Sequence, residues 1–179
     1  MRWYDATEWQ FTRDVGEDRL RTSIHLACCR EMNDATDRPP ATGVIHLFCP
    51  APYLRKSRPK AAVLRQIGWC IEHQTRIQEA VLAQLFADLQ RYWSNVAEEK
   101  GKAPELTDVG QLRDYTQLHS IEIQPFDRDG LPCLVVGVAL SWEMGTWDVF
   151  LHGARALPVP PDGDEPEYFD WDQAMEAAS

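Results

Sequence analysis

The hydrophobic period of this chain changes twice along its length. Before Pro59 and after Gly101, apolar residues either alternate with polar ones or form short runs, as they do in β-strands. Between these two positions, apolar residues recur every three or four residues, which is the period of an amphipathic helix. The order of strands, then helices, then strands favours an α+β fold over alternating βαβ units.

The helical region predicts two helices, at about residues 60–72 and 74–97, or one kinked helix. A buried stripe is expected on the second helix, formed by Ile77, Val81, Leu85, Leu89, Tyr92 and Val96. Strands are expected at 7–15, 20–29, 43–54, 117–126, 131–143, 146–153 and 154–159, and a short helix near 107–115. The predicted fold is an antiparallel sheet of about five to seven strands with the helical pair packed on one face.

Length and charge indicate one domain with an acidic tail. A chain of 179 residues with 44% apolar residues is long enough for one hydrophobic core, which we place in residues 1–157. Residues 158–179 are rich in proline and contain seven of the acidic residues but no Lys or Arg. The net charge is −10 and basic residues do not cluster, so direct nucleic-acid binding is not expected.

The cysteines and the apolar runs indicate a reducing compartment. The five cysteines are odd in number and form no CxxC pair, which is typical of free thiols in the cytoplasm. The first ten residues lack the apolar core of a signal peptide, and no run approaches the ~18 apolar residues of a membrane span. We therefore expect a soluble cytoplasmic protein, without membrane contact and without a cofactor.

Three stretches carry a resemblance to a known family. They are "IQEAVLAQLFADLQRYW", "LTDVGQLRDYTQLHSIEI" and "GVALSWEMGTWDVFLHGARALPV", within residues 60–157. They resemble a family of uncharacterised bacterial domains with a helical pair and a closing Trp-Asp-Glu-Glu-His-Gly hairpin. This chain has Trp142-Glu143-Met144-Gly145 there, so it lacks the extra acids and the histidine. The resemblance implies a small α+β domain of the accessory or toxin-neutralising kind.

Cysteine and histidine side chains suggest two candidate sites, one for a metal ion and one for a nucleophile. His25 and Cys29 share a strand face, and His46 lies on a strand that is expected to be a neighbour, so the three are zinc candidates if the register is favourable. The alternative is a packed cysteine on a polar strand face, and we expect no metal. Cys70 and His73 share a helix face, as a nucleophilic thiolate and its base would. The alternative is that Cys70 is part of the core, as a helical cysteine usually is.

Two other histidines have expected positions. His119 falls on the apolar face of its strand, together with Ile121 and Ile123, which predicts a core histidine. His152 lies next to Gly153 in an expected turn, which predicts contact with solvent.

The aromatic residues of the tail are the candidate partner-binding residues. Tyr168, Phe169 and Trp171 lie among acidic residues, and aromatic residues are enriched at interface anchors. No catalytic motif is present, which favours a non-catalytic protein-binding module, immunity-like or accessory. The alternative for the tail is that it folds back and covers its own sheet.

A second possible function rests on small residues in the strand over residues 132–143. Gly137, Ala139 and Ser141 share one face, and they leave room either for a ligand or for a closely packed helix. A small enzyme or ligand-binding domain is therefore the alternative to the binding module. Both a monomer and a homodimer through an edge strand are compatible with the sequence.

Overall fold

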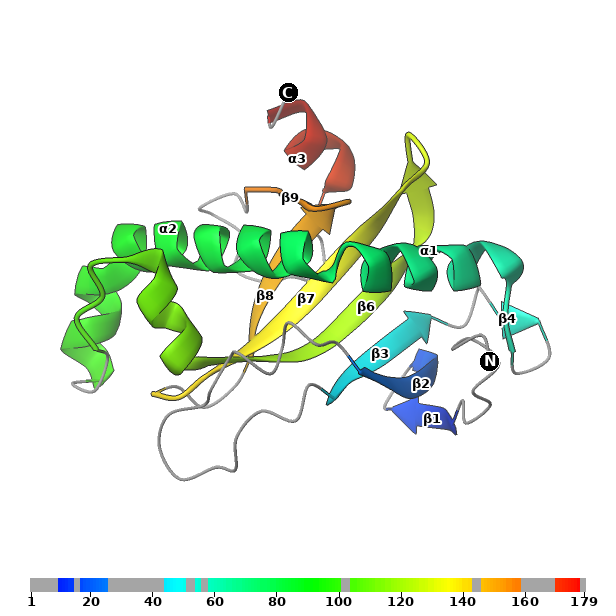
Figure 1. Cartoon of the computed structure of the whole chain (residues 1–179), viewed down its shortest axis with the longest axis horizontal. Helices are drawn as coiled ribbons and strands as arrows, with labels where there is room; N and C mark the ends of the chain where they lie inside the picture. Colours follow the sequence, from blue (N-terminus) through cyan, green and yellow to red (C-terminus); the bar gives the residue numbers. More distant parts are fainter. Residues whose placement is uncertain are drawn as a thin grey trace.

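The structure is a computed structural model of the chain (Figure 1). It describes residues 10–14, 17–25, 44–50, 54–55, 58–100, 104–142, 146–158 and 170–177. The strands are β1 (Gln10–Asp14), β2 (Glu17–His25), β3 (Val44–Pro50), β4 (Leu54–Arg55), β5 (Arg58–Pro59), β6 (Thr116–Arg128), β7 (Leu131–Leu140), β8 (Thr146–His152) and β9 (Arg155–Ala156). The helices are α1 (Ala61–Glu72), α2 (Gln74–Lys100), the 3₁₀-helix η4 (Val109–Asp114) and α3 (Trp171–Ala177).

Two helices form where the helical period was found, as predicted. The buried residues of α1 are Val63, Gln66, Ile67 and Cys70, which are spaced three or four residues apart. The break between the helices is at His73, whose backbone N–H donates to the carbonyl oxygen of Trp69. In α2, Ile77, Val81, Leu85 and Leu89 of the predicted stripe are fully buried. The stripe's Tyr92 and Val96 have side chains outside the described set.

One sheet contains seven of the described strands, in the order β1-β2-β3-β6-β7-β8-β9. The α+β class, the strand number and the helical pair on one face are therefore confirmed. The sheet is mixed, however, because β3 and β6 pair in parallel while the other neighbours are antiparallel. A parallel pair needs a long crossover connection, and the α1–α2 pair supplies it.

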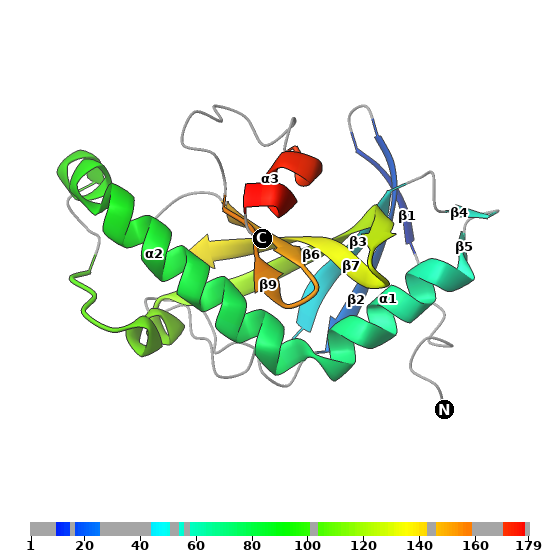
Figure 2. The same ribbon diagram turned by 90° about the horizontal axis from the view of Figure 1, so that it is seen from above.

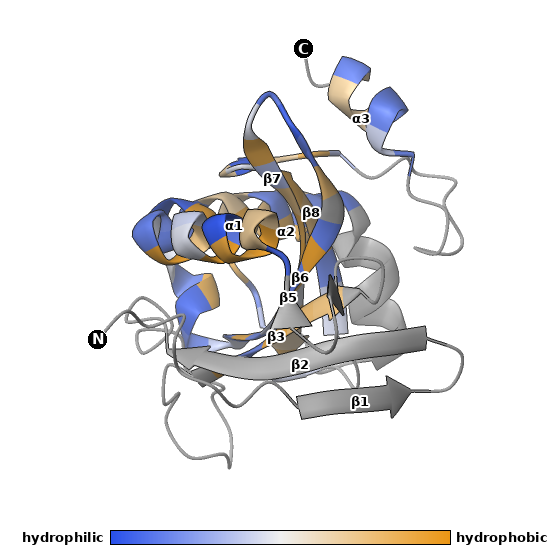
Figure 3. Ribbon diagram, turned by 90° about the vertical axis from the view of Figure 1, so that its right-hand side faces the viewer, coloured by the Kyte–Doolittle hydropathy of each residue, from blue (hydrophilic) through white to orange (hydrophobic). Residues whose placement is uncertain are grey.

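The main core lies between this sheet and the two long helices. The residues of the main core lie at every second position of β3, β7 and β8, and α1 and α2 pack against the sheet on this face (Figures 1 and 2). The strand residues of the core are Ile45, Leu47, Cys49, Leu118, Ile121, Ile123, Leu134, Val136, Val138, Leu140, Val149 and Leu151. Figure 3 shows hydrophobic residues on β7 and β8 where they lie beside the helices. We call the opposite surface of the sheet the outer face.

Turn chemistry and a bulge set the register of the central hairpin. Asp129 and Gly130 both have positive φ, at 52° and 73°, as a tight two-residue turn between β6 and β7 requires. Further along, Leu118 pairs with Val138 while Ser120 pairs with Gly137, so β6 carries one extra residue. The extra residue changes which side chains of β6 reach the outer face.

Part of the acidic tail packs against the sheet. The α3 helix lies on the outer face, on the other side of the sheet from α1 and α2 (Figure 2). Its Ala174 is buried with Phe150 and Leu157, apart from the main core. Residues 171–177 of the tail therefore fold back onto the protein's own sheet, as the alternative interpretation of the tail expected.

Removing a large side chain from the helix–sheet layer should destabilise the protein strongly. Leu85 is fully buried, so Leu85→Ala is expected to lower the free energy of unfolding by about 2–5 kcal/mol in urea denaturation. The control is Arg76→Ala on the exposed side of α2, with an expected change of under about 0.5 kcal/mol. Equal effects of the two substitutions would contradict the position of the core.

Candidate functional site

Polar and aromatic side chains gather on the outer face of the central strands. Because side chains alternate between the two faces of a strand, the partners of the core residues point away from α1 and α2. The described outer-face residues near the sheet centre are His46, Phe48, His119, Ser120, Glu122, Val135, Gly137, Ala139, Asp148 and Phe150. Two carboxylates, two imidazoles and a hydroxyl therefore share one surface.

Four of these residues form a row across the sheet. His46 pairs with Ser120, Ser120 pairs with Gly137, and Gly137 pairs with Asp148. The row crosses β3, β6, β7 and β8 perpendicular to the strands. Residues that are far apart in the sequence are neighbours here because of the register alone.

Gly137 leaves space in this row that its neighbours use. A Cβ atom at Gly137 would lie 2.6 Å from Oγ of Ser120 and 3.5 Å from Oδ1 of Asp148. The hydroxyl and the carboxylate thus lie over the glycine from opposite sides. The backbone of β7 forms the floor between them.

Two carboxylates of the outer face, those of Asp148 and Glu122, act on each other electrostatically. Burial raises the pKa of Asp148, and the negative charge of Glu122 raises it further. Glu122 accepts a hydrogen bond from Nε2 of Gln124 at 3.1 Å, and its charge also contributes to the raised pKa of Cys49. Within the described part of the chain, Asp148 makes no hydrogen bond or ion pair. This pair of carboxylates was not predicted from the sequence.

His119 is a correction to the sequence-based prediction of a core histidine. The β-bulge puts His119 and Ser120 between the buried Leu118 and Ile121, so His119 is exposed on the outer face. Its ring meets the ring of His46 edge-on, with 5.6 Å between the centroids. A strict alternation of faces, which the prediction assumed, fails at the bulge.

The zinc candidates are only partly within the described residues. His25 pairs with Val44 in β2–β3, so its backbone is two register positions from His46, which pairs with Ser23. Cys29 lies outside the described residues. No group of three His, Cys, Asp or Glu side chains in the described ranges is arranged to hold a metal ion.

Gly137 and Ala139 of the possible pocket lie on the outer face of the sheet. The α2 helix packs on the other face, so it does not cover these two residues. Gly137 is buried beneath its neighbours, and Ala139 is half-buried between Gln117 and Thr146 in the register. Ser141 follows the end of β7, and its backbone N–H donates to the carbonyl oxygen of Tyr115 at 2.9 Å. The helical pair covers the opposite face, which carries Val136 and Val138.

The candidate partner-binding aromatics of the tail have different positions. Tyr168 and Phe169 lie outside the described residues. Trp171 is half-buried at the start of α3, where it contacts Phe126 and Phe150. Its role in partner binding stays a prediction.

The remaining thiol and imidazole candidates have structural environments. Cys70 is fully buried and burial raises its thiol pKa to about 12, so it is not a thiolate at neutral pH. The ring of His73 stacks on Trp69 with 4.1 Å between centroids. His152, which was expected in solvent, is buried, and its Nε2 donates to the carbonyl oxygen of Arg128 at 2.9 Å. His152 pairs with Cys133 in the register, so it lies near the end of the β6–β7 hairpin and next to Arg128.

No protein-family model, curated protein or solved structure matches the chain. The resemblance to bacterial accessory domains therefore stays a prediction. Among the described helices, none has both the length and the apolar character that a membrane span needs.

A side chain at Gly137 should disturb the row through Ser120. In Gly137→Val, the added Cβ would meet the Ser120 hydroxyl, so the free energy of unfolding should fall by about 1–3 kcal/mol. In a Ser120→Ala background the loss should be smaller, since the clashing oxygen is absent. Urea denaturation of the double-mutant cycle measures this coupling, and additive effects would contradict the close approach.

The raised pKa of Asp148 predicts a pH-dependent gain from Asp148→Asn. The ionised carboxylate opposes folding once the pH exceeds the unfolded-state pKa of about 4, and this penalty is absent below it. The substitution should raise the free energy of unfolding at pH 7, by less than about 1 kcal/mol for a half-exposed group, and leave it unchanged at pH 3. Asp114→Asn on exposed η4 is the control, and a gain that is larger at pH 3 would contradict the assignment.

Proposed function

We propose that this protein is a non-catalytic binding module whose outer face binds a basic surface of a partner protein. The observation that carries the proposal is the pair of half-buried carboxylates, Glu122 and Asp148, on a sheet face that the long helices leave open. Like charges that are close together and partly desolvated disfavour folding, and such arrangements concentrate at functional sites. A cation from a partner would be attracted to both carboxylates and would compensate the charge of Asp148.

The geometry suits a guanidinium or ammonium group. Glu122 on β6 and Asp148 on β8 are separated by one strand, so about 10 Å separates the two strand axes. The Asp148 carboxylate lies near Gly137 of β7, which has no side chain. Phe48 and the two histidine rings supply flat surfaces beside the carboxylates, which is a common setting for an arginine side chain.

The overall charge supports the same partner. The chain has a net charge of −10, and electrostatic complementarity increases the rate of association and selects among partners. The accessory or toxin-neutralising role implied by the family resemblance, in the bacterial cytoplasm, fits such a module. In that role the partner would be a basic protein held by the acidic face.

Matched baits test the proposal. The full chain and the Glu122→Gln/Asp148→Asn variant are used as baits to capture proteins from a cell lysate. The third bait is a control, Glu72→Gln/Glu79→Gln, which removes two exposed charges from α1 and α2. A basic protein should be retained by the wild type and by the control but lost with the outer-face variant. The purified partner should then bind the outer-face variant at least about tenfold more weakly, with a strong dependence on salt.

The control makes the outcome specific. If the same protein binds all three baits equally, the outer face is not the interface. If only acidic or uncharged proteins depend on Glu122 and Asp148, the proposed partner chemistry is wrong.

Small-ligand binding remains the second candidate function, and one observation favours it. The small-residue face with Gly137 and Ala139 is not filled by α2, which was the packing that would have removed the case for a ligand. A ligand over β7 would be excluded by Gly137→Val, whereas the protein interface around Glu122 would keep most of its contacts. Comparing Gly137→Val with the Glu122→Gln/Asp148→Asn variant in the same binding assay separates the two functions.

A further inference from the structure

A second, apolar surface lies beside the polar row on the outer face. We define the docking patch as Phe126, Val135, Phe150 and Leu157, which come from β6, β7, β8 and the residue after β9. Phe150 and Leu157 are buried, but they belong to a small cluster that is separate from the main core. The cluster is completed by residues of α3.

The α3 helix presents one apolar edge to the docking patch. Trp171, Ala174 and Met175 are spaced at i, i+3 and i+4, so they lie on one side of the helix. The Trp171 ring meets Phe126 and Phe150 edge-on, with 5.7 and 5.8 Å between centroids. Ala174 has no long side chain and is only 3% exposed. This is the pattern of a helix recognised in an apolar groove.

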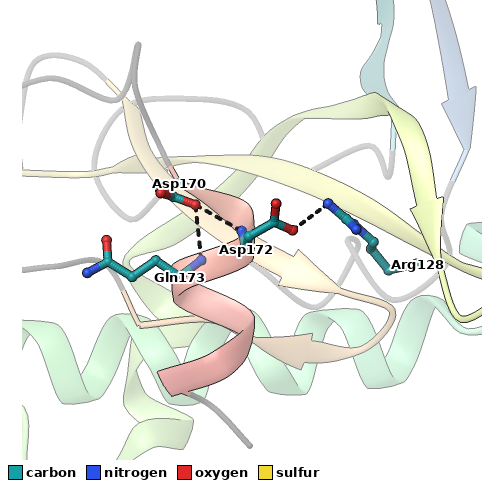
Figure 4. A network of polar contacts seen from close by, with 4 residues as sticks. All are labelled: Arg128, Asp170, Asp172 and Gln173. Atoms are coloured by element: carbon teal, nitrogen blue, oxygen red, sulfur yellow. Dashed lines mark hydrogen bonds and ion pairs between the residues drawn. The ribbon is translucent and has the colours of Figure 1, made fainter.

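Polar contacts at the rim set the direction of α3. The Arg128 guanidinium donates to the Asp172 carboxylate, which is on the residue next to Trp171 (Figure 4). The Asp170 carboxylate accepts the backbone N–H groups of Asp172 and Gln173, both at 3.0 Å, and caps the helix. Since the side chains of Arg128 and Asp172 are 45% and 73% exposed, their ion pair orients the helix more than it holds it.

The length of α3 makes its helical form dependent on the docking patch. Seven residues are far fewer than the ~12–15 that an isolated helix needs in water. The eleven residues 159–169 connect α3 to the sheet and can span at most about 40 Å. Because α3 belongs to the same chain as the docking patch, it competes intramolecularly with a helix supplied by a partner.

We infer that the docking patch is a binding site for a short amphipathic helix supplied by a partner protein, and that α3 occupies it in cis. The recognised helix would carry an aromatic residue, a small residue and an apolar residue at i, i+3 and i+4, with an acidic residue after the aromatic one. A partner helix of this chemistry binds when α3 leaves. This inference is independent of the carboxylate pair and of the function proposed above.

A peptide that copies the tail tests the inference with the full chain. A fluorescent peptide of residues 168–179 is titrated with the wild-type chain and with the Trp171→Ala chain, and binding is followed by anisotropy. The tethered α3 competes in the wild type but is weakened in the variant. The peptide should therefore bind the variant at least about tenfold more tightly than the wild type.

Charge reversal tests whether the peptide binds as α3 does. Adding Arg128→Glu to the Trp171→Ala chain should weaken the peptide about two- to fivefold, and an Asp172→Arg peptide should recover the loss. A peptide with its own Trp171→Ala substitution should not bind. Equal binding to both chains, no binding to a Trp171→Ala chain with a native circular dichroism spectrum, or undiminished binding of the substituted peptide would overturn the inference.

Discussion

The parallel pairing of β3 with β6 is the constraint on which the rest of the structure depends. It joins the N-terminal strands to the β6–β9 meander in one sheet, and it requires a connection that crosses the whole sheet. The α1–α2 pair is that connection, so its apolar stripe is buried on one face only. Because a single crossover uses one face, the other face is left for polar residues and for α3.

The division between the two faces explains why charged groups can gather at the centre of a buried sheet. A strand that is covered on both sides would be apolar throughout, whereas here the long helices cover only one face of the sheet. On the outer face the same strands carry Ser120, Glu122 and Asp148, and Gly137 lets the side chains of Ser120 and Asp148 come close to the backbone of β7. The core supplies stability on one side, and the resulting rigid sheet holds the carboxylates in fixed positions on the other.

Local patterns in the sequence identified the elements but not how they meet. The helical stripe with Ile77 and Leu85 depends on neighbouring residues of one helix, and it was found where expected. The bulge at His119 and the parallel pairing depend on a partner strand, so no local period could indicate them. The alternation of β6 placed Glu122 on the polar face, but its proximity to Asp148 required the register of β7 between them. The candidate site is therefore a property of the pairing rather than of a motif.

The two parts of the outer face differ in how firmly they are held. The polar row is built from strands of the main core, whereas the apolar part is covered by a helix of seven residues that contributes three side chains to a separate cluster. Ordering one residue costs about 1–2 kcal/mol, and fully burying one large apolar side chain contributes about 1.5–3 kcal/mol. Trp171 and Met175 are only partly buried and Ala174 is small, so α3 is held by far fewer apolar contacts than the elements of the main core. The release of α3 would leave the main core intact. It would also expose the apolar docking patch beside the carboxylates of the outer face.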